Sequence, residues 1–542
     1  MSAEPSKSHE KKLRDRIVAP ADSMGGTGMK KRNILLIMTD QQRFDTIEAL
    51  GNPIIRTPAL NDLVEKGISF TRAYSPCPVC VPARMSLLTG QLPHRTGCVD
   101  NTPSEYRESL MQILSRNGYQ TMGAGKMHFT LTDKSKMDEH QVDALLGKLN
   151  KLTEMWGFEK RATSECDEMD DYKSFIRSTE YSHVPEPSGE RSEMYYIPQP
   201  SQLPAKYNET AWVTDRSIDY LKNRDADRPF FLMTSFQAPH PPFVAPFPWN
   251  KIYRSADMPL PKMPDDFDNL LTLWNRYQNR YKYMDQGVNK NLLRTLKAYY
   301  YAMITFIDYN LGRLFDYMAS QNLMEDTLIL FTSDHGEMLG DYNSFGKRCF
   351  LDSAARIPLL MRSPDGEKGL RNETPVSLVD ILPTILEFAE IDSHASYSGE
   401  SLFDIVHGRR KRDAIYGQFQ REGLASYMML DDQYKYIYSA PDQREWLFHS
   451  RNDKDETRSI AENTLYLGKT EEMRNRMIRF FREEGYLDPI DGDGWKQYPL
   501  RTMPRDPDAY LLYQDAGDFI PKKDAYRSDA NTMKYYRDKW YE

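Results

Sequence analysis

The stretch NILLIMTDQQ, residues 33–42, decides the fold, because a short apolar run passes directly into Asp40, Gln41 and Gln42. A continuous apolar run of this length, rather than an alternating one, is typical of a strand that is buried on both faces of a parallel sheet. In open α/β sheets, ligands bind at the carboxyl ends of the strands. The stretch therefore predicts an α/β fold with Asp40 at its binding edge.

Helical and strand patterns alternate along the rest of the chain. We expect helices over residues 57–67, 110–119, 211–223, 292–322 and 378–391, and strands over residues 68–74, 120–129, 229–236, 327–337 and 357–364. Thr57 is the expected N-cap of the first helix, and Gly67 its stop. This alternation predicts a layered α/β sheet flanked by helices. The side chains at the ends of its strands are Asp40, Lys126, His128, His240 and Asp334.

Changes in composition divide the chain into regions. Residues 1–32 are a polar N-terminal extension, and residues 33–412 carry the α/β pattern, interrupted by a polar insertion at about 130–205. Residues 413–542 begin with short alternating segments suited to an antiparallel sheet and end in a tail that we expect to wrap the surface. A chain of 542 residues exceeds the size at which single hydrophobic cores stop growing, about 250–300 residues, which agrees with this division.

Composition excludes several classes of function. The formal net charge is −8, which does not favour binding to nucleic acid. No segment approaches the roughly 20 apolar residues of a membrane span, so no membrane partner is expected. The first residues lack the apolar stretch of a signal peptide, which predicts a cytoplasmic protein, or a periplasmic or secreted one if the native N-terminus was replaced. The sequence indicates no particular oligomeric state.

The segment SPCPVCVPARMSLLTG, residues 75–90, places Cys77 and Cys80 in a C-x-x-C spacing. A redox pair would need a helix within a βαβ context, which is weak here. A zinc ribbon would need a second pair, and the remaining cysteines do not supply one with ligand spacing: Cys98, Cys166 and Cys349. A redox pair and a zinc site are therefore both disfavoured, and we expect Cys77 to be a small buried residue of the core.

Cys80 can instead be grouped with the residues that follow it. If VPARMSLL opens a helix, Arg84 lies one turn from Cys80 on the same face. The N-terminus of that helix would add partial positive charge at the cysteine. The grouping would therefore place positive charge beside Cys80.

Other motifs hold polar residues that each have an ordinary explanation. An aspartate after a strand, such as Asp40, can cap a helix or a turn. His335 precedes a glycine in SDHGE and could lie in a turn, and His240 lies among prolines in QAPHPP and could be on a surface loop. Single lysines such as Lys126 in GKMHF and Lys347 in NSFGKRCF are usually solvated. No one of these motifs is diagnostic alone.

Taken together and in this order, the motifs resemble those of the type I, formylglycine-dependent sulfatases of the alkaline-phosphatase-like superfamily. CVPARMSLLTG resembles the family signature in which Cys80, Pro82 and Arg84 are the fixed positions. The resemblance implies a large mixed central sheet flanked by helices, with a small C-terminal α+β subdomain. It also implies that a maturation enzyme oxidises Cys80 to formylglycine, whose hydrate attacks sulfur through one hydroxyl and expels sulfate through the other.

The resemblance further implies a metal site and a set of catalytic groups. The metal ligands would be Asp40, Gln41, Asp334, His335 and an oxygen of modified Cys80. Ligands that are mostly hard oxygens favour Ca²⁺, or Mg²⁺ or another divalent ion, over zinc. Arg84, Lys126 and Lys347 would neutralise sulfate, His128 would take the proton of the diol, and His240 would protonate the leaving alcohol.

The expected function is a sulfuric ester hydrolase acting on a sulfated carbohydrate, either an oligosaccharide or a polysaccharide. Choline sulfatase, arylsulfatase, and phosphonate monoester or phosphodiester hydrolase remain as alternatives within the superfamily, and a catalytically silent metal-binding protein remains outside it. The pair Lys126 and His128 favours sulfatases over the phosphonate-type relatives. Arg43, His94 and the 130–205 insertion are candidates for substrate contacts because they lie near the motifs.

Overall fold

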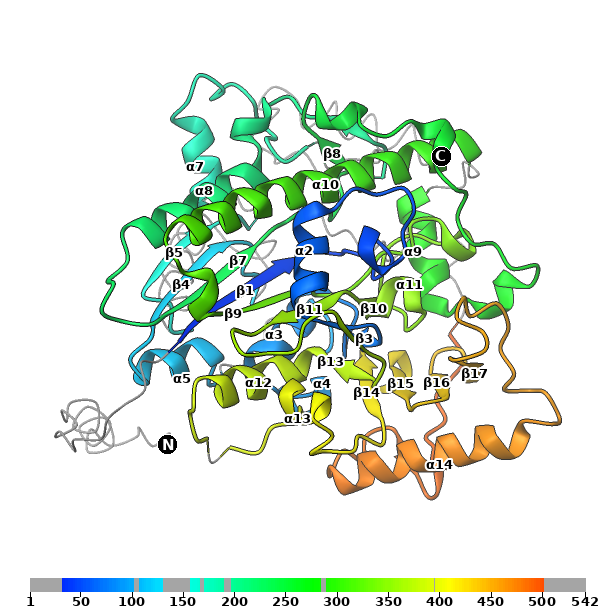
Figure 1. Cartoon of the computed structure of the whole chain (residues 1–542). Helices are drawn as coiled ribbons and strands as arrows, with labels where there is room; N and C mark the ends of the chain where they lie inside the picture. Colours follow the sequence, from blue (N-terminus) through cyan, green and yellow to red (C-terminus); the bar gives the residue numbers. More distant parts are fainter. Residues whose placement is uncertain are drawn as a thin grey trace, which may run out of the picture. The chain divides into compact units, whose positions relative to one another are not determined.

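Strand β1 (Asn33–Thr39) lies inside an eight-stranded mixed sheet of order β12-β2-β11-β9-β1-β7-β4-β5 (Figure 1). A computed structural model describes residues 32–101, 107–129, 156–165, 170–189, 196–283, 289–393 and 395–501. Both neighbours of β1 run parallel to it: β7 (Phe230–Ser235) and β9 (Thr327–Ser333). The α/β class and the mixed central sheet predicted from the sequence are confirmed.

The other strands extend this sheet on both sides. Beyond β7 lie β4 (Gln120–Gly125) and β5 (Lys160–Thr163), each parallel to its neighbour. Beyond β9, β11 (Leu359–Arg362) runs antiparallel to both β9 and β2 (Ile68–Phe70). The edge strand is β12 (Leu370–Asn372), parallel to β2. Two small sheets complete this region: β10 (Arg356–Ile357), β3 (Ala73–Tyr74) and β13 (Val376–Ser377), and β6 (Gln199–Pro200) with β8 (Val244–Ala245).

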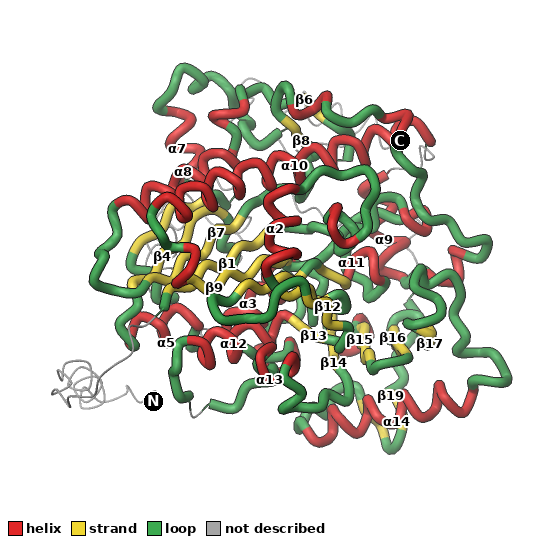
Figure 2. Tube along the Cα trace, in the orientation of Figure 1, coloured by secondary structure: helices red, strands yellow, loops and turns green. Residues whose placement is uncertain are grey.

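Helices cover both faces of the sheet (Figure 2). Successive side chains of a strand point to opposite faces. Leu35 and Ile37 of β1 accordingly pack in one core with helices α2 (Pro58–Lys66), α8 (Glu209–Lys222) and α10 (Lys290–Ser320). Leu36 and Met38 pack in another core with α3 (Cys80–Thr89), α5 (Leu110–Arg116) and α12 (Ile381–Phe388). Burial on both faces explains why β1 is apolar from Ile34 to Met38.

A four-stranded antiparallel sheet forms the C-terminal part, as the alternating pattern predicts. Its strands are β14 (Ile415–Phe419), β15 (Ser426–Leu430), β16 (Tyr434–Ser439) and β17 (Arg444–His449). Helix α14 (Leu467–Glu483) packs in one core with this sheet, and a ribbon of β18 (Ile490–Asp491) and β19 (Gly494–Trp495) follows. The tail expected to wrap the surface lies outside the described residues from 502 onward.

The remaining helices are short apart from α9, and they connect the larger elements. They are α4 (Pro93–Thr96), α7 (Asp171–Arg177), α9 (Leu273–Tyr283), α11 (Asp352–Ala355) and α13 (Leu402–Val406). Within the described ranges, none of the helices combines the length and the apolar character needed to cross a membrane.

Part of the range predicted to be an insertion belongs to the central sheet. Strand β5 lies within residues 130–205 and pairs with β4 as an edge strand. Its sequence, KRAT, is polar and only its alanine is buried, so it carries no apolar run that would mark it as a strand. Residues 130–155, 166–169 and 190–195 of this range lie outside the described residues.

Candidate functional site

The ends of β1 and β9 place two aspartates side by side. Asp40 follows β1 and Asp334 follows β9, and because these strands are parallel neighbours, both carboxyl groups lie at one edge of the sheet. Cys80, the first residue of α3, and His335 complete a buried group. One ligand atom from each of the four residues lies within 4.8 Å of the others.

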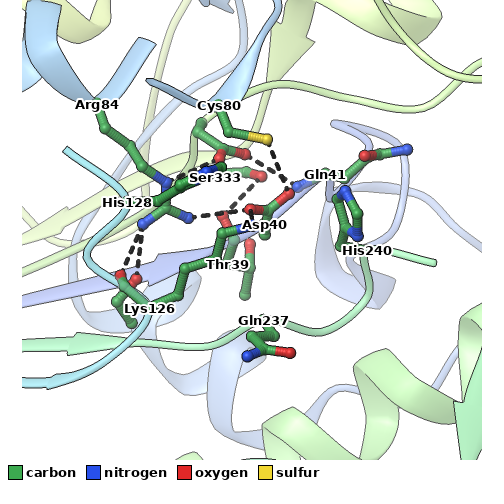
Figure 3. Close-up of polar contacts among 12 residues, drawn as sticks. Thr39, Asp40, Gln41, Cys80, Arg84, Lys126, His128, Gln237, His240 and Ser333 are labelled. Carbon is green, nitrogen blue, oxygen red and sulfur yellow. Dashed lines mark hydrogen bonds and ion pairs between the residues drawn. The ribbon is translucent and has the colours of Figure 1, made fainter. Parts of the chain in front are cut away.

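The Cys80 sulfur is surrounded by polar groups (Figure 3). Its Sγ lies 2.9 Å from Lys347 Nζ, 3.3 Å from His335 Nε2 and 3.7 Å from Asp40 Oδ1. Burial and the charge of Asp40 would raise the pKa of Cys80, but Lys347, Lys126 and His335 outweigh them and lower this pKa well below its usual value. The surroundings therefore stabilise negative charge at this position.

Cys77 has different surroundings. Its Sγ donates to the backbone carbonyl of Val99 at 3.6 Å, and burial, together with the charge of Asp100, raises the pKa of Cys77 well above its usual value. Both cysteines are free thiols. The C-x-x-C spacing thus does not correspond to a shared redox or metal site.

Arg84 joins the two aspartates. As its spacing predicts, it lies one helical turn from Cys80 on α3. Its Nε donates to Asp334 Oδ2 at 3.0 Å and its Nη2 donates to Asp40 Oδ2 at 3.3 Å. Nη1 donates to Ser235 Oγ and to the Lys126 carbonyl, both at 2.9 Å. These contacts direct the guanidinium to the carboxylates, so Arg84 positions them.

Both predicted lysines are buried at the site instead of being solvated. Lys126 Nζ lies 2.6 Å from Asp40 Oδ2, and Lys347 Nζ donates to Gln41 Oε1 at 2.8 Å. Burial would raise the pKa of Asp40, but Lys126, together with His240, Lys347 and Arg84, holds this pKa well below its usual value. Asp40 is therefore ionised.

Gln41 adopts a backbone conformation that is uncommon for a residue other than glycine. Its φ is 69°, in the left-handed region, and such conformations persist where the surrounding structure holds them. Its N–H donates to Asp334 Oδ1 at 3.0 Å, and its carbonyl accepts from the Tyr300 hydroxyl at 2.6 Å. Its side-chain nitrogen donates to Glu337. The chain thus turns sharply at the end of β1 and brings the Gln41 amide beside Lys347.

The donor set fits a divalent cation. Burial and the charge of Asp40 raise the pKa of Asp334, because the negative charge of one buried carboxylate disfavours ionisation of the other. His335 Nε2 lies 3.6 Å from Asp334 Oδ1 and 4.0 Å from Asp40 Oδ1. Carboxylate oxygens are the preferred ligands of Ca²⁺ and Mg²⁺. A cation among these groups would relieve the repulsion between the aspartates.

The two predicted catalytic histidines, His240 and His128, have different surroundings. His240 lies in the turn after β7 and lines a cavity of about 40 Å³ together with Lys126 and Gln237. His128 has a φ of 47°, and its backbone N–H donates to Glu165 Oε2 at 2.9 Å. Its Nδ1 is buried and, within the described residues, has no hydrogen-bond partner. His240 thus faces the cavity, whereas no contact joins the described His128 ring to Cys80.

Glu337 is a site residue to which the sequence analysis gave no role, although it closes the motif SDHGE. Its carboxylate accepts from the Gln41 side chain, from the Tyr196 hydroxyl at 3.0 Å and from the backbone N–H of Gly346 at 2.5 Å. Gly346 immediately precedes Lys347. Glu337 therefore holds both the Gln41 amide and the loop that carries Lys347.

The candidate substrate contacts Arg43 and His94 are engaged elsewhere. Arg43 forms ion pairs with Asp45 at 2.7 Å and Asp341 at 2.9 Å. His94 Nε2 lies 3.2 Å from Glu484 Oε2, and its ring packs against aromatic residues near the end of α14. Both side chains thus link parts of the fold.

Glu209 is a buried acid that lines the same cavity as His240. It accepts from the backbone N–H of Gln237 at 3.3 Å, and burial raises the pKa of Glu209 from 4.5 to about 8. Between these values the folded protein retains a proton that the unfolded chain releases, so stability falls as the pH rises. Glutamine keeps the acceptor oxygen but does not ionise, so the stability of Glu209→Gln should not fall with pH in this way. We expect its free energy of unfolding near pH 7 to exceed that of wild type by up to about 3 kcal/mol.

Urea unfolding of Glu209→Gln and wild type between pH 4 and pH 8.5 checks this expectation. The difference in the free energy of unfolding should be small at pH 4 and grow towards pH 8. A difference that stays constant over this range would contradict the proposed burial of a neutral Glu209.

Comparisons with known proteins agree with this geometry. A family model described as Sulfatase matches residues 32–391, and one described as N-sulphoglucosamine sulphohydrolase, C-terminal, matches residues 340–483. An arylsulfatase of Clostridium perfringens is 31% identical over 487 residues, covering 87% of this chain and 99% of the relative. An N-acetylglucosamine-6-O-sulfatase of Bacteroides thetaiotaomicron is 25% identical, covering 82% and 85%. The structure of a phosphonate monoester hydrolase of Agrobacterium radiobacter has the same fold, with a TM-score of 0.70, 24% identity and coverage of 86% and 100%.

Proposed function

The chain belongs to the sulfatase family of the alkaline-phosphatase-like superfamily, and from that premise we propose that it removes sulfate from a sulfated carbohydrate with a nucleophile made from Cys80. It is a sulfatase, an enzyme that acts on sulfated substrates. The observation that carries the proposal is the position of Cys80. Its sulfur, at the first residue of α3, meets Lys347, His335 and Asp40 in one buried site.

We propose that Cys80 is oxidised to formylglycine by a maturation enzyme, which is therefore the implied protein partner. When hydrated, this group supplies a hydroxyl that can attack sulfur. A thiol would instead form a thiosulfate ester with no easy exit. The surroundings support negative charge at this position, because Lys347 lies 2.9 Å from the sulfur and the N-terminus of α3 adds partial positive charge.

We propose that Asp40, Asp334, His335 and Gln41, with residue 80, hold Ca²⁺ or a similar divalent ion. Such an ion supplies Lewis acidity towards a sulfate oxygen. The protein prepares this site through Arg84, which fixes the aspartates at 3.0 and 3.3 Å, and through Glu337, which fixes the Gln41 amide. These partners limit reorganisation of the carboxylates during the reaction.

We propose that Lys126 and Lys347 bind the sulfate oxygens and that His240 protonates the leaving alcohol. Pre-placed cations in a buried site commonly make the largest contribution to the rate. His240 lies on the cavity that Lys126 also lines, which is where a leaving group would reside. His128 remains the proposed acceptor of the second proton, and its ring would have to approach residue 80.

A relative that is named for a sulfated carbohydrate supports a carbohydrate substrate. The relative from Bacteroides thetaiotaomicron is an N-acetylglucosamine-6-O-sulfatase. Lys126, which forms an ion pair with Asp40, belongs to the GKMHF motif, whose resemblance favours sulfatases over phosphonate-type relatives. Choline and aryl sulfates remain the competing substrates within the same reaction class.

The test compares ester classes on protein that is matured and supplied with Ca²⁺. We expect kcat/KM for 4-nitrophenyl sulfate and for sulfated sugars to exceed kcat/KM for phenyl phosphonate monoesters and for phosphodiesters. Glucosamine 6-sulfate, a sulfated disaccharide and choline sulfate are then compared. Equal or faster turnover of the phosphonate ester would contradict a sulfatase, and preference for choline sulfate would contradict the carbohydrate.

A further inference from the structure

A ridge of large side chains on α10 leads from the cavity to the surface. Met303 and Phe306 line the cavity that His240 also lines. Phe306 follows Met303, and Tyr309 follows Phe306, at a spacing of three residues, so each side chain neighbours the next one along the helix. Met303 and Phe306 are buried, whereas Tyr309 is 52% exposed. The ridge therefore passes from the site into solvent.

A second segment adds aromatic rings to this ridge. Strand β8 lies beside α10, and the chain continues from β8 through Pro246, which lines the cavity, to Phe247 and Trp249 (Figure 1). The Trp249 ring lies 5.2 Å from the Phe306 ring and 4.9 Å from the Tyr309 ring. Phe247 is 65% exposed. We call Phe247, Trp249 and Tyr309 the aromatic track.

The aromatic track presents the rings of Phe247 and Tyr309 to solvent. Large apolar rings held in contact with water are unfavourable, and rings grouped on a surface commonly mark a binding site. Lys251 adds positive charge, with its Nζ 5.1 Å from the centre of the Phe247 ring. A partner that fits has flat apolar faces, polar edges and negative charge. Sulfated sugar rings have all three properties.

We propose that the aromatic track binds the sugar rings that adjoin the ring being desulfated, with C–H faces stacked on Phe247 and Tyr309 and a further sulfate near Lys251. This inference rests on the proposed function and narrows it to substrates longer than a monosaccharide. Continuity with the cavity favours this occupant over a second copy of the chain, since Pro246 and Phe306 line the cavity together with Lys126 and His240 and adjoin the rings of the track.

The experiment measures how sulfated sugars inhibit turnover of 4-nitrophenyl sulfate by the matured holoenzyme. The probes are mono-, di- and hexasaccharides prepared from chondroitin sulfate, heparin and carrageenan. We expect at least one hexasaccharide to inhibit more strongly than its own disaccharide. The double variant Phe247→Ala, Tyr309→Ala should weaken this inhibition about tenfold or more, while kcat/KM for 4-nitrophenyl sulfate stays unchanged. Leu465→Ala, which truncates a leucine that is 86% exposed, is the matched control and should change neither value.

The outcomes separate the alternatives. The proposed role of the aromatic track is contradicted if inhibition of wild type does not increase with saccharide length. It is also contradicted if the hexasaccharide inhibits the double variant as strongly as it inhibits wild type. A dimer that dissociates in the double variant with unchanged inhibition would assign the track to self-association and likewise overturn it. If wild type containing formylglycine does not hydrolyse 4-nitrophenyl sulfate, the proposed function is contradicted instead. Calorimetry of hexasaccharide binding to wild type and the double variant then still tests whether the aromatic track binds saccharides.

Discussion

Replacing Cys80 by alanine is expected to abolish sulfate ester hydrolysis, with a loss in kcat on the order of 10⁴ to 10⁶. Alanine can neither become an aldehyde nor present a hydroxyl to sulfur, so the covalent route is lost entirely. Cys80 is the first residue of α3 and is buried beside Asp40, Asp334 and His335. The measurement is kcat for 4-nitrophenyl sulfate with enzyme produced alongside a maturation enzyme.

Cys77→Ala is the matched control, because Cys77 is also buried and lies on the same segment. Its sulfur contacts only the Val99 carbonyl among the contacts described for it, so we expect most activity to remain. A small loss of stability from the missing sulfur would not change kcat. If Cys77→Ala were inactive while Cys80→Ala remained active, the assignment of the nucleophile would be wrong.

Replacing Lys347 by methionine is expected to lower kcat/KM by about 10² to 10³. Methionine has a similar volume but no charge, so the replacement removes the ammonium that lies 2.9 Å from the Cys80 sulfur and 2.8 Å from Gln41 Oε1. Lys347 is fully buried, so solvent screens its charge little. Steady-state kinetics with 4-nitrophenyl sulfate measure the loss, and thermal unfolding checks that the variant is folded.

Lys222→Met serves as the control, since that side chain is 53% exposed on α8 and lies outside the site. It should retain wild-type kcat/KM. Lys347→Arg retains the charge with a different shape and should recover part of the activity. A folded Lys347→Met enzyme with wild-type kcat/KM would show that this lysine does not stabilise the reacting sulfate.

The sequence predicts most of the fold because burial leaves a clear pattern. Strand β1 is apolar from Ile34 to Met38 since both of its faces are covered, and α3 places Arg84 one turn after Cys80, in agreement with their spacing. Contacts between distant residues leave no such pattern. Thr57 is the N-cap residue of α2, as predicted, but its side chain makes no capping hydrogen bond, and Asp308 of α10 instead accepts from Leu60 N at 2.8 Å. The sequence does not predict the polar edge strand β5 either, because only its pairing with β4, and no apolar run, identifies it as a strand.

The candidate site is likewise predicted only in part by the sequence. The motifs predict which residues gather, and the strand order brings Asp40, Asp334 and Lys126 to one edge. They do not predict how the side chains pair. Arg84 contacts Asp334, 250 residues away, and Glu337 holds the amide of Gln41, 296 residues away, because such distant positions meet only in the folded chain. A single sequence contains no record of those pairings.

The central claim is that residue 80 acts as formylglycine, and the mass of one peptide tests it most directly. Trypsin releases residues 73–84, AYSPCPVCVPAR, which contain both Cys77 and Cys80. In protein made with a maturation enzyme, we predict a mass lowered by the replacement of one sulfur and two hydrogens by one oxygen. Fragmentation should place the change at residue 80, which should react with a hydrazide, while Cys77 remains open to alkylation. Fully active protein whose peptide retains both cysteines unmodified would contradict the account.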